Sequence, residues 1–98
     1  MRFIIENLST NPTTALRRAG YTFQHYTDQG EMSFVRIMAR AGYPRFHMYV
    51  TLKGRDLHVS FHIDQKKHTY GDDTRHHGEY EESPTLEQEA ERIKNIVK

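Results

Sequence analysis

An alternation of apolar and polar side chains is clearest in the middle of the chain. Residues 45–52 and 57–64 both follow this period of two, and a short turn segment that contains a glycine separates them. Pairing Leu52 with Leu57 gathers only apolar side chains on one face, which predicts that this face lies on the core. The polar face then holds three cross-strand pairs: Thr51 with His58, Tyr49 with Ser60, and His47 with His62. We therefore predict a β-hairpin with one buried face and one open face.

Weaker patterns on both sides of this hairpin predict further strands and two helices. The strands are expected at residues 2–6, 21–27 and 32–39, and the helices at residues 12–19 and 84–97. Asn11 and Pro12 are typical of a helix start, and Gly20 is typical of the position just after a helix end. In the last helix the apolar residues recur at helical spacing: Leu86, Ala90, Ile93 and Val97. This stripe predicts that the last helix packs on the core.

The strands at 21–27 and 32–39 are expected to form a second hairpin. Asp28-Gln29-Gly30 fits a three-residue loop with glycine in the left-handed region. The register that this loop sets is supported by two apolar pairs: Phe23 with Val35, and Tyr21 with Ile37. In that register the side chains expected on the solvent face include Tyr26, Phe34 and Arg36.

Residues 31–41 leave a second interpretation open. Four apolar residues there also recur at helical spacing: Phe34, Ile37, Met38 and Ala41. Gly42 and Pro44 would end such a helix. We favour the strand because the turn at residues 28–30 needs a partner strand.

The order of the predicted elements is β-α-β-β-β-β-α. It indicates an α+β fold of two layers, in which an antiparallel sheet of four to five strands carries both helices on one face. The length of 98 residues fits a single domain, residues 1–98. Residues 65–82 contain no aliphatic side chain and are expected to form a long polar loop.

Composition narrows the class of protein. Hydrophobic residues make up 36% of the chain and eleven residues are aromatic, which is not typical of a disordered chain. No apolar run is long enough to span a membrane and no signal segment is recognisable, so we expect a cytoplasmic protein without a membrane partner. The absence of cysteine excludes disulfides, thiolate metal ligands and cysteine nucleophiles.

Histidine is the unusual feature of the composition, with seven in the chain. Imidazole titrates near neutral pH and is the commonest metal ligand; seven added protons would raise the formal charge from +1 to +8. Charge is also uneven, since residues 1–67 sum to +5 and residues 68–98 sum to −4. The simpler interpretation is that the acidic part folds back on the basic part. The alternative is that the basic part meets an anionic partner.

His47 and His62 form the first candidate site. Cross-strand Cβ atoms lie about 4.5–5.5 Å apart, so the two imidazoles are close enough to share one metal ion. Asp64 lies two residues beyond His62 on the same face, and His77 or Glu79 in the polar loop would complete the shell. These ligand types suit zinc or another divalent transition metal. No fixed metal-binding motif accompanies them, so solvent-facing histidines without a ligand are the alternative.

A second candidate is an anion-binding or nucleic-acid-binding surface on the open face of the sheet. Cationic and aromatic side chains are expected together there, as on sheets that stack bases and hold phosphates: Arg36, Arg45, Tyr49, His58 and Lys66. The low net charge weakens this hypothesis. Exposed aromatic side chains are also typical of a homodimer interface, so a homodimeric scaffold without catalytic activity is a third alternative.

Three segments resemble an uncharacterised group of short bacterial proteins: Tyr43-Pro44-Arg45-Phe46-His47, His62-Ile63-Asp64-Gln65-Lys66-Lys67 and His77-Gly78-Glu79-Tyr80. The resemblance spans most of the chain. That group has no assigned function, so the resemblance implies no activity. It does place the similar segments around His47, His62, Asp64 and His77–Glu79, where the candidate metal site lies.

Overall fold

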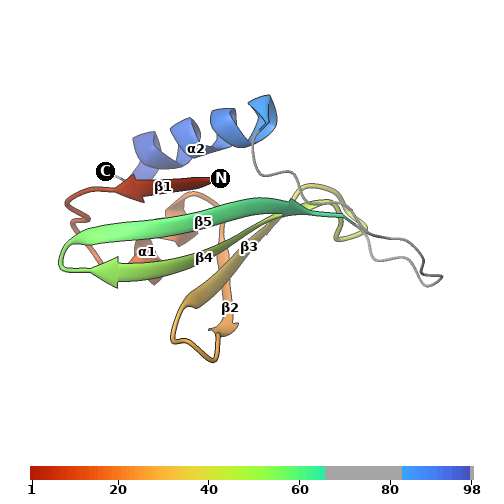
Figure 1. The fold of residues 1–98 in the computed structure, drawn as a ribbon. Coiled ribbons are helices and arrows are strands. Elements are labelled where there is room, and N and C mark those ends of the chain that lie inside the picture. The colour runs from red at the N-terminus through yellow and green to blue at the C-terminus, as the bar shows by residue number, and fades with distance from the viewer. Residues whose placement is uncertain (66–82, 98) are drawn as a thin grey trace.

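The computed structural model has two layers, a twisted sheet and a pair of helices (Figure 1). The structure describes residues 1–65 and 83–97. Its elements, in chain order, are β1 (Arg2–Ile5), α1 (Pro12–Arg18), β2 (Thr22–Tyr26), β3 (Met32–Ile37), β4 (Arg45–Lys53), β5 (Asp56–Asp64) and α2 (Pro84–Val97). Neighbouring strands are antiparallel, in the order β1-β5-β4-β3-β2. The predicted α+β fold is confirmed; of the predicted polar loop, residues 66–82 lie outside the described residues.

The central hairpin has the predicted register. Leu52 pairs with Leu57, and the pairing continues without a shift to Arg45 and Asp64. The apolar side chains between these pairs are buried: Phe46, Met48, Val50, Val59, Phe61 and Ile63. Strict alternation over nine residues in each strand fixes this register, since a slip by one residue would turn the whole apolar face to solvent.

The core lies between this face of the sheet and the two helices. Leu16 of α1 and both Leu86 and Ile93 of α2 are fully buried and belong to one apolar cluster with Met48 and Phe61 of the sheet. The predicted helical stripe therefore packs on the core. Neither helix in the described part of the chain has the length and apolar character needed to cross a membrane.

Both predicted helix starts are confirmed by their caps. Asn11 Oδ1 accepts a 2.8 Å hydrogen bond from Thr14 N, and Ser83 Oγ accepts one of 3.1 Å from Leu86 N. These bonds satisfy backbone N–H groups that have no acceptor within the helix. The caps therefore mark where each helix begins.

The predicted register between β2 and β3 is confirmed next to the turn and is wrong in the half of the hairpin beyond it. Next to the turn, His25 lies opposite Ser33 as that register requires, but a shift between Phe23 and His25 then places Phe23 opposite Phe34. This β-bulge adds one residue to β2. The loop therefore determines only the first two pairs of the hairpin.

This shift reverses the predicted faces of β3. Phe34, expected on the solvent face, is fully buried opposite Met48. Arg36, also expected there, lies on the helix side opposite Phe46, and its guanidinium is 5.7 Å from the centroid of that ring. The prediction that Arg36 belongs to an open anion-binding surface is therefore wrong. The preference for a strand over a helix at residues 31–41 is confirmed, although the strand ends at Ile37.

The turn between β2 and β3 has a glycine in the left-handed region, as predicted. Thr27 N donates a 2.8 Å hydrogen bond to Glu31 O across three loop residues, and Gly30 has φ +86°. No described atom lies within 4 Å of a Cβ added at Gly30, so a side chain there would add only backbone strain. We expect Gly30→Ala to lower the free energy of unfolding by about 1 kcal/mol, measured by chemical denaturation. Gln29→Ala is the control, and equal stability of the two variants would contradict the expectation.

A buried carboxylate joins α2 to the sheet. Glu89 is 6% exposed, and its Oε2 accepts a 2.7 Å hydrogen bond from the hydroxyl of Tyr21, just before β2. Arg92 donates to both carboxylate oxygens at 2.8 and 2.9 Å, and Arg36 Nη1 lies 3.5 Å from Oε2. Burial alone would raise the pKa of Glu89. The hydrogen bonds from Arg92 and Tyr21 outweigh it and lower this pKa below its ordinary value of 4.5.

This lowered pKa predicts a loss of stability in acid. A carboxyl with a lower pKa in the folded chain stabilises the fold above its unfolded pKa, and the contribution is lost as the pH falls through the folded pKa. We expect the difference in unfolding free energy between the wild type and Glu89→Gln to shrink from about pH 6 to about pH 3, by chemical denaturation at each pH. Other carboxyl groups are common to both proteins and cancel in the difference. A difference that stays constant over this range would contradict the prediction.

Candidate functional site

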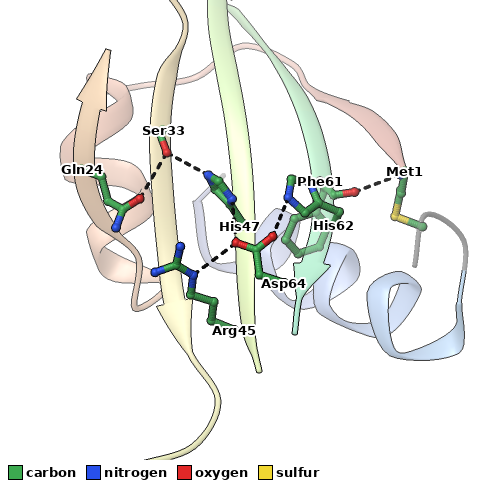
Figure 2. A network of polar contacts seen from close by, with 8 residues as sticks. All are labelled: Met1, Gln24, Ser33, Arg45, His47, Phe61, His62 and Asp64. Atoms are coloured by element: carbon green, nitrogen blue, oxygen red, sulfur yellow. Dashed lines mark hydrogen bonds and ion pairs between the residues drawn. The ribbon is translucent and has the colours of Figure 1, made fainter. Parts of the chain in front are cut away.

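The open face of the sheet, opposite the helices, carries a group of polar side chains on β4 and β5 (Figure 2). His47 of β4 and His62 of β5 are direct cross-strand partners, as predicted, and their ring centroids lie 4.8 Å apart. Asp64 follows His62 on the same face of β5, opposite Arg45. We call His47, His62 and Asp64 the histidine–aspartate cluster.

Asp64 is the centre of the hydrogen bonds in this cluster. Its Oδ2 accepts a 3.0 Å hydrogen bond from His47 Nδ1, and its Oδ1 lies 2.9 Å from His62 Nε2. Arg45 Nε also donates to Oδ2, at 3.2 Å, while its guanidinium lies 4.7 Å from the centroid of the Tyr43 ring. Both imidazoles therefore direct one ring nitrogen at the same carboxylate.

The carboxyl group of Asp64 is ionised although it is partly buried. Burial alone would raise its pKa, because the charged form loses contact with water. The hydrogen bonds and positive charge of His47 and His62 outweigh this effect and hold the pKa of Asp64 well below its ordinary value of 3.8. The cluster thus keeps a negative charge between two imidazoles throughout the neutral pH range.

The second ring nitrogen of His47 is held from the other side. Ser33 Oγ lies 2.9 Å from His47 Nε2 and 3.4 Å from Gln24 Oε1. The hydroxyl of Ser33 has a single proton. When it donates this proton to Gln24, it accepts from Nε2–H of His47; when it donates to His47, Nε2 is the acceptor. Ser33 and Gln24 together therefore accommodate His47 with or without a proton on Nε2.

Ser33, His47 and Asp64 have the hydrogen-bond order of a serine hydrolase triad, from hydroxyl to imidazole to carboxylate. Ser33 is 0% exposed, however, so its hydroxyl does not meet a substrate from solvent. A nucleophile has to approach the reacting carbon at close contact. We therefore assign Ser33 to orienting His47 and not to nucleophilic attack.

The histidine–aspartate cluster has the composition and spacing of a metal site. One ligand atom from each of its three residues lies within 4.8 Å of the other two. Two imidazole nitrogens and one carboxylate oxygen are ligands that zinc, iron and nickel accept. His77 and Glu79, the predicted further ligands, lie outside the described residues.

The fold places three of the predicted anion-binding residues on the open face and one on the helix side. Arg45 is paired with Asp64, and Arg36 is paired with Glu89 on the helix side. Tyr49 does lie at the cluster, with its ring centroid 4.6 Å from that of His47. His58 lies on the open face farther along β5, and Lys66 is outside the described residues. Arg45, Tyr49 and His58 thus share the open face, and Arg36 does not.

Ser33 and Gln24 were not among the predicted site residues, because the predicted register of β3 turns Ser33 to the core. A usable signal was present, since Ser33 and Phe34 are neighbours in a strand and only one of them suits an apolar face. Placing Phe34 in the core would have directed Ser33 to the open face. Gln24 lies at the bulge, and the sequence carries no local signal for a bulge there.

Comparisons with protein-family models, with curated proteins and with solved structures find no match to this chain. The resemblance of three segments to short bacterial proteins stays a prediction.

Proposed function

We propose that this protein binds one divalent transition-metal ion through His47, His62 and Asp64. The observation that carries the proposal is the convergence of three ligand atoms within 4.8 Å on two paired strands. Strands hold side chains more precisely than loops do, which favours a defined coordination geometry. The proposed ion is zinc or a similar metal that accepts both imidazole and carboxylate ligands.

The surroundings of His47 support this proposal. A metal-binding imidazole usually donates its other ring N–H to a neighbouring acceptor, which fixes the ring and its tautomer. Ligation through His47 Nδ1 would place the remaining proton on Nε2, which faces Ser33 Oγ at 2.9 Å. Ser33 accepts that proton while it donates its own to Gln24. Ser33 and Gln24 thus suit the tautomer of His47 that metal binding requires.

Charge gives the proposed centre an affinity for a further, anionic ligand. A divalent ion on the cluster would meet one carboxylate, while Arg45 adds a positive charge 3.2 Å from Asp64. The centre would therefore carry excess positive charge, with coordination positions left for water, hydroxide or an added side chain. Completion of the shell by His77 or Glu79 stays a prediction.

Calorimetric titration of the chelator-treated protein with zinc tests the proposal. We expect saturable binding of about one ion per chain. The absence of saturable binding with zinc, nickel and iron(II) would refute the proposal.

Removal of the Ser33 hydroxyl tests the role of the residue behind His47. We expect Ser33→Ala to weaken zinc binding by about 10- to 100-fold, the usual effect of losing the partner of a ligating imidazole. Ser33→Thr keeps a hydroxyl and serves as the comparison. An unchanged zinc affinity of Ser33→Ala, with the fold verified by circular dichroism, would contradict the assigned orientation of His47.

A further inference from the structure

A groove lies beside the histidine–aspartate cluster on the same open face. It has a volume of about 650 Å³ and crosses the sheet from β1, over β5 and β4, to the residue before β3. Tyr49 lines it and also contacts His47, with 4.6 Å between the ring centroids. The groove and the histidine–aspartate cluster are therefore neighbours, with Tyr49 between them. Its volume lies within the range of about 300–1,000 Å³ that is usual for small-molecule sites.

The groove exists because short side chains alternate with long ones on this face. Ser60 lies between Arg2 and Tyr49 across the strands, and Thr51 lies beside His58. The longer side chains surround those of Ser60 and Thr51. The floor therefore carries hydroxyl groups, which donate or accept hydrogen bonds.

The charged residues around the groove are mainly cationic. Arg2 stands at the β1 side and Lys53 at the far end of β4, with His58 between them on β5; Glu31 is the acidic lining residue. Within residues 1–65 and 83–97, Arg2 and Lys53 make no ion pair. In the part of the chain that the structure describes, these two cations are thus available to an anionic ligand.

Arg2 is held in position although it is the second residue of the chain. Met1 donates from its amino group to Phe61 O at 2.9 Å and accepts from Phe61 N at 2.7 Å. Arg2 is the cross-strand partner of Ser60 in the next pair. The hydrogen bonds of the neighbouring Met1 therefore fix the start of β1 on β5, whereas terminal residues without such bonds commonly fray.

We infer that this groove binds a small organic phosphate monoester that carries an aromatic ring. Arg2, Ser60 and His58 are neighbours on β1 and β5, and a guanidinium with adjacent hydroxyl and imidazole groups matches the oxygens of a phosphate. The ring of Tyr49, across the strand pair from Ser60, provides a flat wall for the organic part. This inference does not depend on a metal at the cluster.

Adenosine monophosphate, adenosine and inorganic phosphate are the probes for this inference, measured by calorimetry in the presence of a chelator and with no residues added before Met1. We expect adenosine monophosphate to bind at least about tenfold more tightly than either of the other two, because only this probe uses both the cations and the ring. Arg2→Gln is expected to weaken its binding by about tenfold or more. Arg18→Gln, an equal charge change at an exposed residue of α1, is expected to leave it unchanged.

Three outcomes would overturn the inference. The first is that adenosine monophosphate does not bind at millimolar concentration. The second is that adenosine binds as tightly, which would show that the cations contribute nothing. The third is that Arg18→Gln weakens binding as much as Arg2→Gln, which would indicate general attraction to the surface. Because a chelator is present, none of these results bears on metal binding, and failure of the metal proposal would leave this test unaffected.

Discussion

Zinc binding by His47→Ala and by His62→Ala is expected to be weaker than in the wild type by more than about 100-fold. Each change removes one of three ligands, and this loss should exceed that of a residue behind a ligand, which weakens binding by about 10- to 100-fold. Asp64→Asn is expected to act in the same direction, because it keeps the shape of the side chain and removes its charge. Competition with a chromogenic zinc chelator measures all three variants.

His58→Ala is the matched control for these variants. His58 lies on β5 and faces the open side, as His62 does, but it is opposite Thr51 and outside the cluster. The control is expected to bind zinc as the wild type does. If His47→Ala and His62→Ala kept full affinity with an intact fold, the histidine–aspartate cluster would not be the metal site.

The largest expected effect on stability comes from Glu89→Leu, at about 2–3 kcal/mol of unfolding free energy. The change leaves the hydroxyl of Tyr21 without its acceptor, and Tyr21 is 2% exposed, so water does not replace the lost bond. Arg36 and Arg92 are each 36% exposed at their side chains and regain water, which limits the effect. Chemical denaturation at neutral pH measures it.

Two further variants separate the buried hydrogen bond from other effects at Glu89. Glu91→Leu makes the same change at an exposed position of α2 and is expected to alter stability by less than about 0.5 kcal/mol. Adding Tyr21→Phe to Glu89→Leu removes the unpaired hydroxyl and is expected to restore part of the loss. Equal effects of Glu89→Leu and Glu91→Leu would show that the carboxylate does not hold α2 to the sheet.

Local patterns predicted most of this fold because most of its elements depend on local signals. The central hairpin follows from strict alternation, and both helices follow from cap residues and apolar spacing. The pairing of β2 with β3 does not follow from such signals. A single bulge between Phe23 and His25 moved Phe34 into the core and Arg36 to the helix side. The position of a β-bulge depends on how side chains pack across the whole sheet. A short segment of the sequence does not specify that packing.

The candidate site was also predicted in one part and missed in another. His47, His62 and Asp64 were predicted to lie together because they belong to the one hairpin whose register the sequence specifies. The contacts of Ser33 and Gln24 with His47 arise from β2 and β3, where the predicted register failed. Arg36 and Glu89, which form an ion pair, are 53 residues apart in the sequence, so no local pattern predicts their contact.

The cluster and the neighbouring groove suggest one arrangement for binding an anion. Excess positive charge at a metal on the cluster and the cations of the groove, Arg2 and Lys53, would both attract an anionic ligand on the same face. Tyr49 lies at the boundary between the two. The metal proposal and the phosphate inference are nevertheless tested separately, since the second is measured without metal.

Anomalous diffraction at the zinc absorption edge, from crystals of the zinc-loaded protein, tests metal binding by the cluster most directly. We expect one strong peak at about 2.0–2.2 Å from His47 Nδ1, His62 Nε2 and one oxygen of Asp64. No peak at the cluster, or zinc bound only by other histidines such as His25, His58 or His77, would contradict the proposed function.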